Sequence, residues 1–248
     1  MKLFSCTIVI FCALLFSCKK ETETVTFNYE YNLLPLEIGN YIIYKGDSII
    51  YNYFFAQVKR SSSFYLKETI KDTSRDNLNR LRYEISVQMR YDTTQNWGVE
   101  KIHYIVPTKT TIERVEDNLR YIKLIFPNQL GTQWNPNKYI TQKIPYIFTL
   151  DTSLNIINSK AIVTSKDVNY SNSFKSFDST LTTTNLIDSS AINLYKLTER
   201  YAKNIGLVYL ERWNVIAKDP NTDQSLPWID KGRLGFYLKL EAMQYGKE

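Results

Sequence analysis

The sequence predicts an all-β fold: a mostly antiparallel, curved sheet of about ten strands, shaped as a half-barrel or a sandwich, with little helix. The clearest evidence is residues 83–91, where apolar side chains occupy every odd position and polar side chains every even one. Residues 234–242 show a similar alternation. Because neighbouring side chains of a strand point to opposite faces, this period is typical of a strand with one buried face. Short, turn-rich links between such segments favour antiparallel pairing.

The other expected strands are short runs rich in Tyr, Ile, Val, Thr and Phe, which are good strand formers. In chain order, all the expected strands are 41–45, 50–58, 64–71, 83–91, 99–106, 119–126, 146–150, 161–168, 181–187, 205–216 and 234–242. Turn residues separate them, beginning with Gly46-Asp47 after the first strand. Residues 194–201 fit both helical and strand spacing, and we favour a strand that residues 202–204 turn into the next one. Gly206 would permit a bulge or a close backbone approach in that hairpin.

The N-terminus predicts a lipoprotein signal. The apolar run Leu3 to Phe16 is shorter than the roughly 20 residues that a membrane-spanning helix needs, but it is typical of a signal peptide. Small Ser17 directly before Cys18, with Leu15 three residues before Cys18, matches the lipobox of proteins that are acylated on cysteine and cleaved ahead of it. An ordinary secretory signal or a short membrane anchor is the alternative.

This signal sets the expected organisation of the chain. Residues 1–17 are the signal peptide, residues 18–28 carry the acyl chains (palmitate among them) on Cys18 and form a flexible tether, and residues 29–248 form a single β domain. Cleavage removes Cys6 and Cys12, the other two cysteines. The mature domain then has no thiol for a disulfide, a metal site or a nucleophile.

The partners expected from the sequence are the membrane, through lipidated Cys18, and an envelope ligand or protein. The net charge is only +6, and the basic residues are scattered rather than clustered. Neither a basic stripe nor a recognition motif is present, so we expect no nucleic-acid partner. Glycine-rich phosphate loops are also missing, and we expect no cofactor.

Four phrases and the lipobox together resemble a known group of proteins. The phrases are LPLEIGNY at residues 34–41, VEDNLR at 115–120, LIFP at 124–127 and ERYAKNIGLV at 199–208. With the start Cys18-Lys19-Lys20, they resemble uncharacterised outer-membrane-type lipoproteins of Bacteroidota. The resemblance implies an extracytoplasmic β domain held on the outer membrane, and it brings no catalytic residues. It leaves open whether the domain faces the periplasm or the cell surface.

Catalytic candidates are few. His103 is the only histidine, and alternation places it with Lys101 opposite the apolar Ile102 and Tyr104, so we interpret it as a surface imidazole. The sequence has no nucleophile elbow for a Ser-His-Asp arrangement. An envelope hydrolase that uses a carboxylate pair is the alternative function, because two carboxylates across a cleft can serve as acid and base. The carboxylates considered for it are Glu113, Glu116, Asp117, Glu199 and Glu211.

A weak calcium candidate lies near the C-terminus. Asp219, Asn221, Asp223 and Asp230 occupy positions 1, 3, 5 and 12 of a calcium-loop frame. Gln224 replaces the glycine of the sharp turn, and Asp-Pro-Asn is also ordinary turn chemistry. We therefore do not assign a metal.

Aromatic residues are the remaining functional lead, with nineteen Tyr, twelve Phe and four Trp. Trp97 in a hairpin end and Trp228 beside Pro227 are the expected exposed ligand contacts. Strand-forming tyrosines in a sheet also need no ligand. The favoured function is non-catalytic binding of a lipid, a glycan or a protein, or a structural role, in the cell envelope.

Overall fold

The computed structural model describes residues 31–52, 59–140, 159–217 and 225–248. Cys18, the expected strand 146–150 and the end of the expected strand 50–58 lie outside these residues. Twelve strands and two short helical segments make up the described chain. They are η2 (Tyr31–Leu33), β1 (Asn40–Asn52), β2 (Lys59–Arg75), β3 (Leu81–Arg90), β4 (Lys101–Pro107), β5 (Thr111–Glu116), β6 (Leu119–Ile125), β7 (Gln133–Trp134), β8 (Ala161–Ser171), β9 (Ser176–Ser189), β10 (Asn193–Ala202), β11 (Gly206–Ile216), α2 (Trp228–Lys231) and β12 (Leu234–Lys247).

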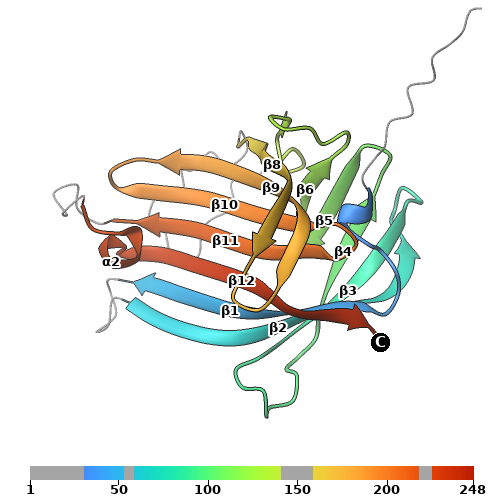
Figure 1. The fold of residues 1–248 in the computed structure, drawn as a ribbon, viewed down its shortest axis with the longest axis horizontal. Coiled ribbons are helices and arrows are strands. Elements are labelled where there is room, and N and C mark those ends of the chain that lie inside the picture. The colour runs from blue at the N-terminus through green and yellow to red at the C-terminus, as the bar shows by residue number, and fades with distance from the viewer. Residues whose placement is uncertain (1–30, 53–58, 141–158, 218–224) are drawn as a thin grey trace, which may run out of the picture.

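All twelve strands form one antiparallel sheet, in the order β6-β5-β4-β3-β2-β1-β12-β11-β10-β9-β8-β7. The sheet therefore consists of two meanders, β1 to β6 and β7 to β12, which the pairing of the first strand with the last one joins at the centre (Figure 1). The predicted fold class is confirmed, with twelve strands in place of about ten.

The connectivity makes the sheet curl. The edge strands β6 and β7 are consecutive in the chain, and only seven residues, 126–132, separate them. A flat sheet of this size would hold its edges about 53 Å apart, at ~4.8 Å per strand spacing, whereas the fully extended link reaches at most about 28 Å. The edges must therefore approach each other, and they do: the Trp134 indole donates a hydrogen bond to the Ile122 carbonyl at 2.9 Å, and the Ile122 amide donates to the Pro136 carbonyl at 2.8 Å.

Curling places the inner faces of the two meanders opposite each other. One buried apolar cluster draws residues from β2 to β6 and also from β8 to β10. Its buried members are Leu33, Ile70, Ile85, Val87, Ile105, Ile112, Leu124, Phe126, Val163, Leu181 and Tyr201. This cluster packs part of the interior, and several of its members, such as Ile70, Ile85 and Ile105, also form part of the wall of the cavity described below.

The predicted turn at Gly46-Asp47 is wrong, because both residues lie inside β1. Gly46 pairs with Phe64 of β2, and a Cβ at Gly46 would lie 2.5 Å from the Phe64 ring. This glycine provides the space in which a neighbouring aromatic ring covers the strand, so its role is packing and not chain reversal.

Residues 111–116 form β5, a strand that we did not expect because its sequence mixes Thr, Ile, Glu and Arg. The favoured strand at 194–201 is confirmed as part of β10, and residues 203–205 turn it into β11 as a hairpin. Gly206 lies at the start of β11 with φ +111°, and its backbone closely approaches Ile42. The register of this pair shifts at Arg200 and Tyr201, as at a bulge.

Gly235 and Gly131 provide a matched pair that tests the packing of the central strands. Both have positive φ, but a Cβ at Gly235 would lie 1.9 Å from the Asn214 carbonyl oxygen, whereas a Cβ at Gly131 would meet nothing within 4 Å. We expect Gly131→Ala to lower the free energy of unfolding by about 1 to 2 kcal/mol through backbone strain alone. Gly235→Ala should lower it by more than about 3 kcal/mol, because the backbone of β11 must also move. Urea unfolding measures both, and equal losses would contradict the contact between β11 and β12.

Candidate functional site: a cavity inside the curved sheet

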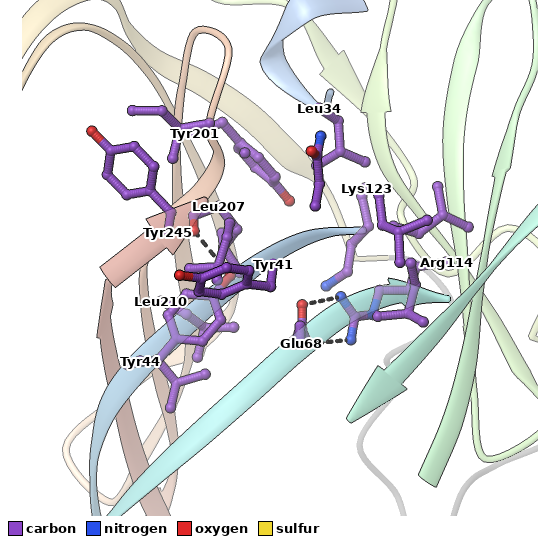
Figure 2. Close-up of a pocket in the computed structure, with 18 of the residues that line it drawn as sticks. Leu34, Tyr41, Tyr44, Glu68, Arg114, Lys123, Tyr201, Leu207, Leu210 and Tyr245 are labelled. Atoms are coloured by element: carbon purple, nitrogen blue, oxygen red, sulfur yellow. Dashed lines mark hydrogen bonds and ion pairs between the residues drawn. The ribbon is translucent and has the colours of Figure 1, made fainter. Parts of the chain in front are cut away.

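The interior of the sheet holds a cavity of about 520 Å³. Both meanders contribute to its wall, together with the segment that precedes β1 (Figure 2). About half of the lining residues are aliphatic, and several of these side chains stay partly exposed although they line the interior. They are Leu66, Leu197, Leu207, Leu210 and Leu238. The N-terminal residues Leu34, Pro35 and Leu36 and the end of β12, including the 40 % exposed Tyr245, also line it. We call this space the interior cavity.

A set of ionisable side chains lies in the same wall, and we call it the charged belt. Its members are Glu68, His103, Arg114, Glu116, Lys123, Glu199 and Arg212. They include three cations and three carboxylates, so the charges of the belt balance when His103 is neutral. These residues come from β2, β4, β5, β6, β10 and β11.

Arg114 is the centre of the belt. Its guanidinium donates to both oxygens of Glu68, at 2.5 and 3.1 Å, and pairs with Glu116 at 2.6 Å (Figure 2 shows the pair with Glu68). Arg114 is buried, which by itself would lower its pKa, but the two carboxylates raise it. Burial raises the pKa of Glu116, yet the neighbouring basic groups, Arg114 first and then Lys123, His103 and Arg212, together outweigh burial and bring that pKa down to about 2. Both groups are therefore ionised at neutral pH.

His103 accepts a hydrogen bond from Arg114 at 3.0 Å through Nδ1, because a guanidinium has only donors. The neutral ring then carries its proton on Nε2. Burial lowers the pKa of His103, and the Arg114 charge lowers it further. The interpretation of His103 as a surface imidazole is wrong. The inner face of β4 is partly polar, so the 41 % exposed Ile102 is on the outer face and His103 is on the inner one.

The third carboxylate of the belt, Glu199, is held by side chains from two strands. Glu199 of β10 is 4 % exposed, accepts a hydrogen bond from Lys123 of β6 at 2.5 Å, and accepts another from the Tyr201 hydroxyl at 3.0 Å. The ion pair thus joins the two meanders across the interior. Burial, followed by the charge of Glu199, raises the pKa of Tyr201 well above its usual value, so this hydroxyl stays protonated and donates.

A smaller polar space of about 120 Å³ adjoins the interior cavity, and we call it the annex. Five residues line both spaces: Glu116, Lys123, Leu197, Glu199 and Arg212. The annex wall also contains Asn185 and Asn214, which are 8 % and 3 % exposed. Among the described residues, neither carboxamide oxygen has a hydrogen-bond partner.

The two tryptophans predicted as ligand contacts do not line the interior cavity. Trp97 lies under the guanidinium of Arg90, at 4.3 Å from the ring centre. Trp228 begins α2, where Lys231 Nζ lies 4.2 Å from its ring and the ring packs on a cluster that includes Tyr51 and Val215. Both remain predicted surface contacts, separate from the cavity.

Of the calcium candidate, Asp219, Asn221 and Asp223 lie outside the described residues. Asp230 is exposed and pairs with Lys59 at 3.2 Å. Among the residues that the structure describes, no group of three or more His, Cys, Asp or Glu side chains is arranged to hold a metal ion.

The carboxylates of the hydrolase alternative separate into two groups. Glu116 and Glu199 both line the interior cavity. Glu113 does not, because it is buried in another network in which Arg120 lies at 2.5 Å, the Tyr139 hydroxyl at 3.1 Å and Arg80 at 3.5 Å. Asp117 is exposed in a turn and Glu211 is only partly buried, and neither lines the interior cavity.

The sequence analysis missed Glu68, Arg114, Lys123 and Arg212 as parts of a site. A signal for some of them was present, because charged residues interrupt otherwise apolar faces at period two. The patterns are Leu66-Glu68-Ile70 and Leu197-Glu199-Tyr201. A charge within a buried face must find a partner inside the fold, so these patterns indicate an interior polar site.

Comparisons with known proteins give a limited result. No protein-family model matches the chain, and no curated protein matches it. Two solved structures show a likeness, each with 11 % identity, a TM-score of 0.35 and coverage of 86 % of this chain and 98 % of the other. One is a Bacteroides fragilis protein described as a "putative exported protein with YmcC-like fold", and the other is a "putative lipoprotein" from Parabacteroides distasonis. Both proteins come from Bacteroidales. In the described ranges, no helix is long and apolar enough to cross a bilayer.

Because His103 is the only histidine, its titration directly reports the state of the belt. We expect one imidazole signal whose pKa lies below 6.5, with the neutral ring protonated at Nε2, since burial and Arg114 both disfavour the charged ring. Glu116→Gln should lower the pKa further, because it removes a carboxylate that favours the imidazolium. NMR titration measures both values, with the exposed Glu37→Gln as the control. A pKa at or above 6.5 would show that the ring is solvated.

Proposed function

We propose that this protein is a lipid-anchored envelope protein that binds an amphiphilic molecule in its interior cavity without transforming it. The observation that carries the proposal is the wall of partly exposed leucines inside the sheet, directly beside a charged belt. A ligand with an apolar chain and a polar end matches this combination. The cavity volume of about 520 Å³ lies within the ordinary range for small-molecule sites, about 300 to 1,000 Å³.

The driving force follows from burial. Leu66, Leu197 and Leu210 project into the cavity and remain partly exposed. Covering apolar surface contributes about 25 cal/mol per Å², so an alkyl chain that fills the cavity gains stability from both its own surface and the leucine surface. A polar molecule without an alkyl chain would leave these leucine side chains in contact with water and would gain no binding free energy from covering them.

The charged belt supports binding rather than chemistry. A hydrolase of the carboxylate-pair type needs one carboxylic acid with a raised pKa to protonate the leaving group. Glu116 instead has a pKa of about 2 and pairs with Arg114. Glu199 is held by Lys123 and Tyr201. Carboxylates that are already paired with cations provide a fixed polar end for the cavity.

The expected anchor complements such a ligand. Acyl chains on Cys18 would hold the domain close to a bilayer, where amphiphiles are concentrated, and each buried CH₂ contributes about 0.8 kcal/mol to that attachment. We place the anchor in the outer membrane as part of the same proposal, because the sequence resembles outer-membrane-type lipoproteins.

Leu197→Trp tests the cavity directly. The larger side chain should occupy the space in which an alkyl chain would lie, and we expect at least a tenfold weaker affinity for dansyl-labelled undecanoic acid, measured by fluorescence titration. The control is Leu81→Trp, which changes a 41 % exposed leucine at the start of β3, outside the cavity wall. This control should bind as the unchanged protein does. An equal loss of affinity in both variants, or unchanged affinity in Leu197→Trp, would show that the alkyl chain of the ligand binds outside the interior cavity.

The anchor has an equally direct test. Cys18→Ser should abolish labelling by an alkyne-bearing palmitate analogue in growing cells and should move the protein out of the membrane fraction. Cys12→Ser, inside the expected signal peptide, is the matched control and should be labelled normally. Continued labelling of Cys18→Ser would overturn the anchor.

A further inference from the structure

The annex presents hydrogen-bond acceptors that find no donor among the residues that the structure describes. Asn214 is 3 % exposed and Asn185 is 8 % exposed, and neither Oδ1 atom has a partner among the described residues. The amide nitrogen of Asn185 does contact Ser159 Oγ, at 3.5 Å. A buried acceptor without a donor costs about 1 to 3 kcal/mol, so a molecule that brings donors to these two oxygens gains binding free energy in the annex.

Arg212 supplies donors at the junction of the annex and the interior cavity. Its side chain lines both spaces and lies over the Phe236 ring, 5.4 Å from the ring centre. It takes part in none of the ion pairs found among the described residues. Arg114 and Lys123, in contrast, are held by carboxylates. Within the described part of the chain, the annex therefore combines two asparagine oxygens that have no donor with a guanidinium that no ion pair holds.

Hydroxyl groups fit this pattern better than a charged group does. A hydroxyl donates to one neighbour and accepts from another, so adjacent hydroxyls of one molecule can serve the asparagine oxygens and the Arg212 guanidinium together. The belt already balances three cations with three carboxylates. A neutral group preserves that balance, whereas a fully charged group would leave an excess charge in a buried place.

The remaining wall and the size of the annex are consistent with a ring that carries hydroxyls. Trp134, Trp213, Tyr121 and Tyr195 line the annex and offer apolar surface beside the polar groups. A volume of about 120 Å³ exceeds the roughly 30 Å³ that one water molecule occupies in the liquid. The space thus accommodates more than a single bridging water.

We infer that the annex binds the sugar or polyol head of a neutral glycolipid whose alkyl chain occupies the interior cavity. This inference rests on the proposed function and names its ligand class: an uncharged, hydroxyl-bearing head on an apolar chain. The head donates to Asn185 and Asn214 and accepts from Arg212, and the five residues that line both spaces place the annex directly beside the cavity that holds the alkyl chain.

The test compares three probes with the same chain: decyl glucoside, decanoate and decyl phosphocholine, each below its micelle-forming concentration. Their affinities are measured by displacement of dansyl-labelled undecanoic acid from residues 18–248 carrying Cys18→Ser. We expect decyl glucoside to bind at least fivefold more tightly than the other two. Asn214→Leu should lower glucoside affinity roughly 5- to 10-fold, as expected for a lost hydrogen bond to a buried group, and should leave decanoate affinity unchanged.

Two further variants keep the outcome interpretable. Asn185→Leu tests the second acceptor independently, in case Asn214→Leu fails to fold, and Asn77→Leu in an exposed turn is the matched control. Thermal unfolding adds a readout: replacing an unpartnered buried amide by leucine should preserve or raise the melting temperature while glucoside binding falls.

The possible failures are distinguishable. Preference for decanoate or phosphocholine, or glucoside affinity that both asparagine variants leave unchanged, would overturn the annex assignment and leave the apolar cavity in place. Failure of all three probes and of the dansyl ligand to bind would overturn the proposed function, and the annex assignment with it.

Discussion

The seven-residue link between β6 and β7 is the constraint on which the rest of the structure depends. It joins strands at opposite edges of a twelve-stranded sheet, so the sheet must curl until those edges are within reach. Curling gives the sheet an inside, and only then do Lys123 of β6 and Glu199 of β10 meet as an ion pair. The cavity, the charged belt and the annex all lie on the face that this connection encloses.

The interior combines two requirements that normally oppose each other. Aliphatic side chains favour closing the two walls against each other, and they do so in the cluster around Ile85 and Leu124. Ionised groups resist dehydration unless they are paired, and the belt pairs all of its carboxylates. Because the bulky paired groups stand between the walls, the leucines around them remain partly uncovered. The charged belt thus acts as a spacer that keeps the cavity open.

Alternation in the sequence predicted the fold class and most strands, because burial of one strand face is a local property of the chain. It wrongly predicted a turn at Gly46, where the glycine leaves space for the ring of Phe64 on the next strand. It also wrongly placed His103 on the surface, because the inner face of that strand is partly polar. The site depends still more on distant partners: Arg114 meets Glu68 across 46 residues, and Lys123 meets Glu199 across 76. Such pairs are defined by the order of strands in the sheet, which single-residue patterns do not contain.

The pairing of β1 with β12 has a consequence for how the chain reaches this fold. These two strands form the central seam of the sheet, with register contacts from Asn40 with Lys247 to Asn52 with Leu234. Loop closure between such distant segments is slow and requires both ends of the chain. A chain that is made N-terminus first therefore cannot complete this seam until β12 has been made. Up to that moment β1 can pair with β2 but lacks its partner on the other side, and the two meanders are not joined.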